Sequence, residues 1–217
     1  MASCPMWDHA ADRPKHQDLA FLPIHETLDV MVSEGEEESW CSTTGDQAGF
    51  AADLHEWGAR MGLDVVKNLF ACIGLWGDSA PFAKRQSLFL LLFTVISGVH
   101  RERFWVTALT NKCLCQCGCF GRCTFDLIFK VVAWSFRALA AGRYPMVDHE
   151  GNEFPQGSHR ASLAGKALKV RAACLAKYGD WQWFKQVLGL QGWKGDGARE
   201  ADLLAMPSHA WRDMPLL

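Results

Sequence analysis

The sequence has no apolar run long enough to cross a lipid bilayer. Its longest run, Leu88 to Ile96, is broken only by Thr94 and is far shorter than the roughly 20 residues that a membrane-spanning helix requires. Met1 to Ala20 holds acids and two prolines in place of an apolar stretch, so no secretory signal is expected. We therefore expect an intracellular protein with no membrane partner.

The motifs of several enzyme classes are also missing. The chain has no Gly-x-Ser-x-Gly nucleophile elbow, no dinucleotide-binding Gly-x-Gly-x-x-Gly and no phosphate-binding Gly-x4-Gly-Lys-Ser/Thr loop, which argues against nucleophilic hydrolysis and nucleotide chemistry of these types. The composition, 49% hydrophobic and 21% charged residues, is that of a globular protein rather than a disordered one.

Charge divides the chain unevenly although the formal net charge is only -2. Acids dominate residues 1–60, whereas bases exceed acids in residues 61–217. We expect a disordered acidic leader over 1–46, a folded body over 47–193 and an irregular tail over 194–217. A basic body suggests a polyanionic partner, with the leader as a competitor for it; the alternative is a solvating tail on a mildly basic domain.

Apolar periodicity and turn residues predict an α/β protein. The expected elements are a helix over 47–62, strands over 69–76, 87–97 and 104–110, a helix over 125–140, a strand over 168–178 and a helix over 181–190. Thr124 is the expected N-cap of the long helix, and Gly142 and Pro145 are expected to close it.

The first and fourth expected strands each end in a Gly-Asp dipeptide, Gly77-Asp78 and Gly179-Asp180. Carboxylates at the ends of neighbouring strands can share a divalent cation, and Mg²⁺ held in this way activates water for phosphodiester chemistry. The alternative is that both dipeptides are ordinary turns, in which Gly and Asp are common.

Five of the nine cysteines lie close together, in the spacing C-x-C-x-C-x-C-x3-C from Cys113 to Cys123. An odd count and close spacing argue against a disulfide framework and for a reducing compartment. Dense thiols suit Zn²⁺: Cys117, Cys119 and Cys123 are expected to bind it with Cys113 or Cys115, and the other possible ligands are His149 and His159. The alternative is that the cysteines are small buried residues in a tight turn.

The order of three strands, a helix, a strand and a helix, with Asp after the first and fourth strands, resembles the RNase H-like core of DDE transposases. Residues 139–151 and 168–180 are similar to the stretch between the helix and the second Asp in Plavaka and CACTA-type transposases. The segments Gly77-Asp78-Ser79, Cys115 to Arg122 and Gly179 to Trp183 also resemble transposon-derived proteins of dinoflagellates.

The resemblance implies an RNase H-like mixed sheet, with Asp78 and Asp180 as catalytic Mg²⁺ ligands for DNA cleavage and strand transfer, in the nucleus. Two features depart from the family. Glu200 and Asp202 follow Asp180 too closely to supply the third carboxylate, and the Cys-x-x-Cys expected after the second Asp is missing. The resemblance thus implies a core truncated at its C-terminus and inactive by itself.

Nucleic-acid contact is also expected from a basic stretch without acids between Pro155 and Gly179. Basic groups neutralise phosphates and indoles stack on unpaired bases, so the expected contact residues are Arg160, Lys166, Lys169, Arg171, Lys177, Trp181 and Trp183. Two further interpretations remain open: a non-enzymatic, zinc-stabilised interaction module, in which the aspartates only form turns, and an inert remnant of a mobile element.

Overall fold

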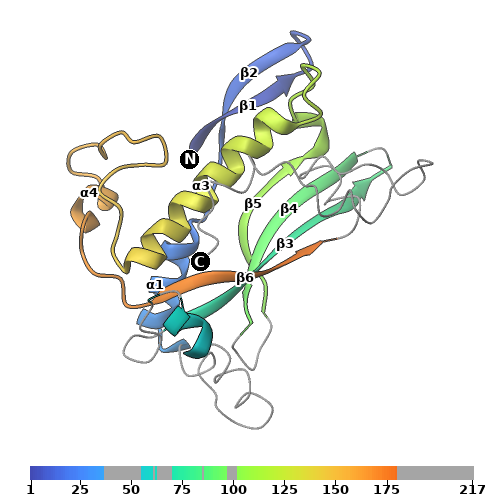
Figure 1. Cartoon of the computed structure of the whole chain (residues 1–217). Coiled ribbons are helices and arrows are strands. Elements are labelled where there is room, and N and C mark those ends of the chain that lie inside the picture. Colours follow the sequence, from blue (N-terminus) through green and yellow to red (C-terminus); the bar gives the residue numbers. More distant parts are fainter. Residues whose placement is uncertain (37–54, 61, 63–69, 85, 97–101, 180–217) are drawn as a thin grey trace.

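The computed structural model describes residues 1–36, 55–60, 62, 70–84, 86–96 and 102–179. The chain begins with a hairpin and a helix and continues into a sheet with one long helix against it (Figure 1). The elements in chain order are β1 (Ala2–Asp8), β2 (Arg13–Leu19), α1 (Ile24–Ser33), β3 (Phe70–Ala83), β4 (Gln86–Val95), β5 (Phe104–Thr110), the 3-10 turn η2 (Asn111–Cys113), α3 (Arg122–Ala141), α4 (His159–Leu163) and β6 (Arg171–Gly179).

The main sheet has four strands in the order β5-β4-β3-β6. β3, β4 and β5 are antiparallel neighbours, and β6 pairs in parallel with β3. A parallel pair needs a long crossover connection, and the segment between β5 and β6 contains α3. The expected mixed α/β class, with three strands, a helix and a fourth strand, is confirmed.

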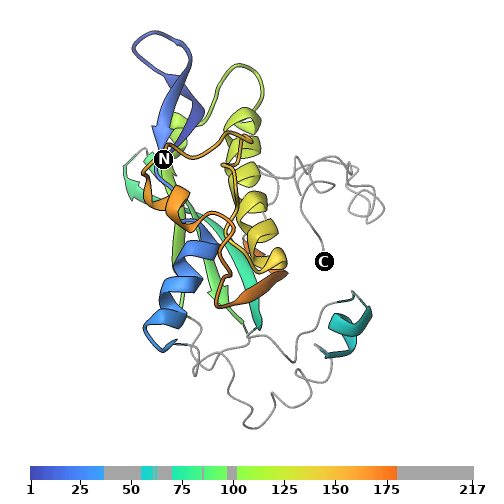
Figure 2. The ribbon, with the colours of Figure 1, turned by 90° about the vertical axis from the view of Figure 1, so that its left-hand side faces the viewer.

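The core lies between α3 and one face of the sheet (Figure 2). On β4, the alternating residues Phe89, Leu91 and Phe93 are fully buried, because successive side chains of a strand point to opposite faces. α3 contributes Ile128 and Leu139, both also fully buried. The expected helix is therefore confirmed, and Gly142 ends it in the left-handed conformation with φ 66°.

The start of this helix was predicted wrongly. The N-cap is Gly121 and not Thr124, which lies inside the first turn of α3. The Thr124 hydroxyl donates a hydrogen bond to the Pro5 carbonyl at 2.6 Å and accepts one from the Cys115 amide at 3.0 Å. Its hydroxyl thus serves contacts with distant parts of the chain instead of the helix end.

The predicted end of the first strand at Gly77-Asp78 is also wrong, because β3 continues through this dipeptide to Ala83. Asp78 pairs with Leu90 and Pro81 with Ser87, so β4 lies beside the whole of this stretch. The register shifts between Pro81 and Ala83, and such an irregularity accommodates a proline, which has no amide hydrogen to donate. The pairing with β4 overrides the local preference of Gly, Asp and Pro for a turn.

The prediction of a disordered leader fails for residues 1–36. β1 pairs with β2 along its length, from Ala2↔Leu19 to Asp8↔Arg13, and the side chains of Cys4, Ile24 and Leu28 are fully buried. The apolar residues of this short stretch are spaced too irregularly to indicate a helix or a strand by periodicity. Their burial comes from contact with α3 and the β5–α3 loop.

The remaining expectations fall mainly outside the described residues. Of the helix expected over 47–62, residues 55–60 are helical, and Trp57 packs on Phe70 with ring centroids 6.2 Å apart. The helix expected over 181–190 and the tail over 194–217 lie outside the described residues. Among the helices that are described, none has the length and apolar character needed to cross a membrane.

Candidate metal centre

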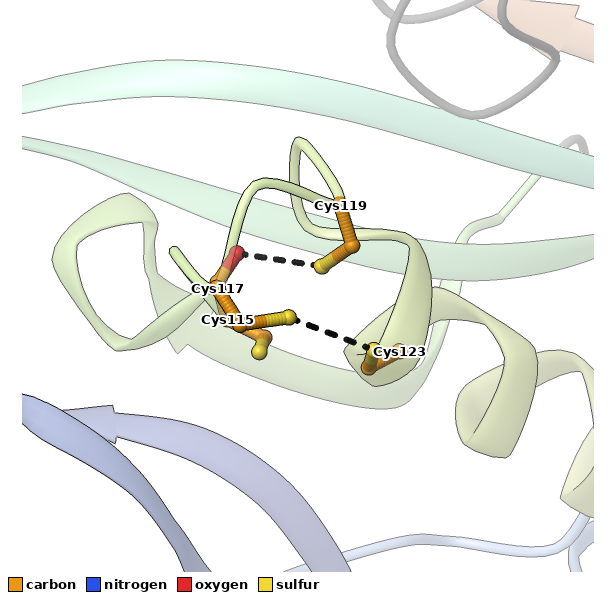
Figure 3. A group of neighbouring side chains, drawn as sticks. All are labelled: Cys115, Cys117, Cys119 and Cys123. Atoms are coloured by element: carbon orange, nitrogen blue, oxygen red, sulfur yellow. Dashed lines mark hydrogen bonds between the residues drawn. The ribbon is translucent and has the colours of Figure 1, made fainter.

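The loop between η2 and α3 (residues 114–121, the cysteine loop) folds back sharply and brings cysteines together (Figure 3). Gly118, Phe120 and Gly121 all have positive φ, at 90°, 53° and 85°. Glycine adopts this left-handed region without steric cost, so the two glycines allow the reversal. In an extended strand the alternate cysteines would instead spread along one face.

Four thiols converge as a result. The Sγ atoms of Cys115, Cys117, Cys119 and Cys123 all lie within 4.8 Å of one another. A zinc ion bound tetrahedrally at about 2.3 Å from each sulfur would place the sulfurs about 3.8 Å apart. The Sγ atoms of Cys117 and Cys123 are already 3.8 Å apart. The group therefore fits Zn²⁺ after shifts of no more than about an ångström.

Backbone hydrogen bonds hold the loop in this shape. The carbonyl oxygen of Cys115 accepts a hydrogen bond from the Gly121 amide at 3.0 Å and one from the Cys119 thiol at 3.5 Å. The Arg122 amide donates to the Cys119 carbonyl at 3.0 Å. The thiols are thus brought together by the fold of the loop itself.

The group combines buried and accessible thiols. Cys115 is 2% exposed, Cys117 is exposed, and Cys119 and Cys123 are intermediate. An ion at this position would be anchored on the protein side by Cys115 and remain reachable from solvent on the side of Cys117. This arrangement allows the metal to enter without unfolding of the core.

The four thiols influence one another's ionisation. Burial alone would raise the pKa of Cys119, but hydrogen bonds from the Cys123 backbone and from neighbouring thiols outweigh it and lower that pKa to about 6. The hydrogen bond that the Cys123 thiol donates to Cys119, together with burial, raises the pKa of Cys123 to about 12. Burial likewise raises the pKa of Cys115. A divalent cation bound among the four thiols would favour the ionised form of each.

Of the two alternatives for the fourth ligand, the loop brings Cys115 to the group, whereas Cys113 lies outside it. The Cys113 thiol is 3.1 Å from the Thr110 hydroxyl and hydrogen-bonds with it. The two histidines are elsewhere: the His149 ring packs against Trp134, and His159 begins α4. Within the described residues, the group of potential ligands consists of the four cysteines alone.

The glycines of the two Gly-Asp dipeptides lie on adjacent strands. Gly77 of β3 pairs with Gly179 of β6 in the parallel register, so the paired positions end one residue before each aspartate. Asp78 is exposed, and its Oδ1 accepts a hydrogen bond from the Ser79 amide at 2.7 Å. Asp180, Glu200 and Asp202 lie outside the described residues.

Several of the predicted nucleic-acid contacts take part in contacts within the protein. Arg160 forms a bidentate pair with Glu26, at 2.6 and 3.2 Å. Arg171 donates to the Ala140 carbonyl at the end of α3, and Lys169 donates to Ser33. Burial lowers the pKa of Lys177 to about 8. Lys166 is exposed, and Trp181 and Trp183 lie outside the described residues.

Sequence reasoning missed the support that the N-terminal hairpin gives to the cysteine loop. Met6 of β1 forms an isolated bridge with Leu114, directly before the first ligand. The His9 ring Nε2 lies 2.9 Å from the Lys112 carbonyl. The buried thiol of Cys4 lies 4.0 Å from the Thr124 carbonyl. No local pattern indicates these contacts, since they join residues about a hundred positions apart.

Comparisons of this chain with protein-family models, with curated proteins and with solved structures find no match.

Proposed function

We propose that the chain is a zinc-stabilised, non-enzymatic interaction module. The observation that carries this proposal is the convergence of four cysteine Sγ atoms within 4.8 Å of one another. Thiolates are soft ligands, which favour Zn²⁺ over Mg²⁺. Four protein ligands complete a tetrahedral shell and leave no open position for substrate, as is typical of a structural zinc site.

The position of the group supports a structural role for the ion. Cys123 lies in the first turn of α3, and Cys115 follows Leu114, which bridges to β1. A zinc ion bound to both would join the start of the long helix to the loop on which the N-terminal hairpin rests. It would thereby hold the exposed part of the loop in one conformation for a partner.

The metal content of the purified full-length chain tests the proposal. We expect about one zinc per chain, because one tetrahedral ion uses all four thiols. Cys117→Ser should lose this zinc, since the hydroxyl is a poor zinc ligand. Cys113→Ser is the matched control: it changes a neighbouring cysteine that lies outside the group, and it should keep the zinc.

Equal zinc content in both variants, or none in the unaltered chain, would rule out this site. Loss of zinc from Cys113→Ser but not from Cys117→Ser would mean that a different set of thiols binds the ion.

A second candidate function, a transposase-derived nucleic-acid-binding domain, is favoured by one specific observation. The parallel pairing of β3 and β6 brings Gly77 beside Gly179, next in sequence to the two aspartates. Neighbouring Asp78 and Asp180 would then hold the Mg²⁺ of an ancestral DNA-cleaving site in the nucleus, within a core that is inactive by itself. The order of three antiparallel strands, a helix and a fourth strand beside the first also supports an RNase H-like core.

Divalent-ion titration of the full chain separates this candidate from the first. If Asp78 and Asp180 share an ion, Asp78→Asn and Asp180→Asn should each weaken Mg²⁺ or Mn²⁺ binding at least about tenfold, because each removes a charged oxygen ligand. Asp18→Asn, on the exposed side of β2, should have no effect. Unchanged ion binding in the first two variants would eliminate the shared site and leave the zinc proposal intact.

A further inference from the structure

The tip of the cysteine loop presents Phe120, whose side chain is 89% exposed. Its backbone has φ 53°, in the left-handed region that a bulky residue rarely occupies. Glycine or asparagine would adopt this conformation at lower cost and would not expose an aromatic ring to water. Two independent costs therefore fall on the same residue.

Basic residues stand on both sides of this loop in the sequence, Lys112 before it and Arg122 after it, and Arg122 interacts electrostatically with Asp126. Lys112 and Arg122 are exposed, and the sequence has no acidic residue between Glu102 and Asp126. Gln116 Nε2 donates to the Lys112 carbonyl at 3.3 Å, so the lysine lies at the base of the same loop.

An exposed aromatic ring with nearby cations suits single-stranded nucleic acid. Unpaired bases stack on aromatic side chains whatever their sequence, while basic groups contact the phosphates. A duplex offers no free base face. A protein partner could also take up an exposed ring, but the absence of any acid from the loop gives the advantage to a polyanion.

We propose that Phe120 stacks on an unpaired base of single-stranded nucleic acid, with Lys112 and Arg122 contacting the adjacent phosphates. This proposal rests on the proposed zinc-binding function, since the ion would hold Phe120 at the loop tip. It names the partner of that interaction module, and it uses residues other than those of the basic stretch before β6.

Fluorescence anisotropy of the zinc-loaded full chain with labelled oligo(dT) tests the stacking proposal. An oligo(dT) of about 20 nucleotides is long enough, because one domain covers roughly 4–16 nucleotides. Phe120→Asn should weaken binding about tenfold, the effect of losing one stacked base. Asparagine tolerates positive φ, so the loop and the zinc should be retained. Phe120→Trp is the matched control and should keep the affinity. Arg122→Gln should reduce the slope of log affinity against log salt by about 0.7, the value for one phosphate contact on a single strand.

The outcomes separate this proposal from the function on which it rests. Three results at one zinc per chain would overturn the stacking proposal and leave the zinc site intact. They are no binding of oligo(dT), equal binding of duplex and single strand, and equal binding of oligo(dT) by Phe120→Asn and the unaltered chain. Absence of zinc overturns both. A tenfold loss in Phe120→Asn at unchanged zinc content, with Phe120→Trp unaffected, supports both.

Discussion

His25 is the most unusual ionisable residue of the core. Its side chain is 1% exposed, and its ring Nδ1 lies 2.8 Å from the Ser135 hydroxyl. Its Nε2 has no hydrogen-bond partner and is 3.9 Å from Glu26 Oε1. Burial, and secondarily the charge of Arg160, lowers the pKa of His25 from 6.5 to about 3. The ring is therefore neutral in the folded protein at physiological pH.

This burial predicts a loss of stability in acid. Between pH 6.5 and about 3 the unfolded chain binds a proton at His25 that the folded protein does not bind. The free energy of unfolding is thus unaffected by this residue above pH 6.5 and falls by about 1.4 kcal/mol for each pH unit below it. Urea unfolding at pH 7 and pH 5 measures the effect.

Two substitutions identify the residue responsible. His25→Gln should remove most of the difference between the two pH values, although it will itself lower stability at pH 7. His16→Gln, in exposed β2, should leave the difference unchanged. If the pH dependence survives in His25→Gln, another group causes it.

At the scale of elements, the contact between β3 and β6 depends on one glycine. A Cβ atom at Gly74 would lie 2.5 Å from Cε2 of Tyr178, so the Tyr178 ring occupies the space that a side chain would need. The same ring stacks on Trp76 with centroids 4.3 Å apart, and the Arg103 guanidinium lies 3.9 Å from the centroid of the Trp76 ring. These rings hold the parallel strand against the sheet.

Gly74→Ala should therefore destabilise the protein by about 1–2 kcal/mol, the usual cost of forcing extra volume into a packed site. Tyr178→Ala removes the ring, so adding Gly74→Ala to it should cost less than Gly74→Ala alone, with only the 3.0 Å approach to Ile96 Cγ2 remaining. Denaturant unfolding of the two single variants and the double variant measures the coupling between the sites. Additive effects would show that the ring does not restrict residue 74.

At the scale of the whole molecule, the cysteine loop joins parts of the chain that are distant in sequence. Leu114 bridges to Met6 of β1, and the first turn of α3 holds the Pro5 carbonyl through Thr124. The hairpin and the long helix thus meet at the loop that carries the four thiols. An ion bound there would stabilise the global fold as well as the loop, because it binds the folded chain in preference to the unfolded one.

Chelation of zinc should therefore lower the melting temperature of the full chain. A loss of a few kcal/mol corresponds to about 5–10 °C for a protein of this size. Differential scanning calorimetry with and without a chelator measures the shift. Cys117→Ser should melt at the lower temperature under both conditions and Cys113→Ser should respond as the unaltered chain does. A melting temperature that the chelator does not change would contradict a structural ion.

The sequence alone determined much of the element order. β5 has the predicted bounds, Phe104–Thr110, and α3 ends at Gly142 as expected. Both are set locally: a short run rich in β-branched and aromatic residues favours a strand, and glycine accepts the left-handed conformation that ends a helix. The density of cysteines likewise indicated a loop that could hold a metal ion, without any knowledge of the fold.

Tertiary structure decided the rest. Only the reversal of the loop distinguishes Cys115 from Cys113, because spacing permits either as the fourth ligand. Pairing with β4 extended β3 through Gly77-Asp78, and contact with α3 and the cysteine loop ordered residues that their acidic composition suggested were unfolded. In each case the deciding interaction joins residues far apart in the chain, and a local pattern carries no information about such a partner.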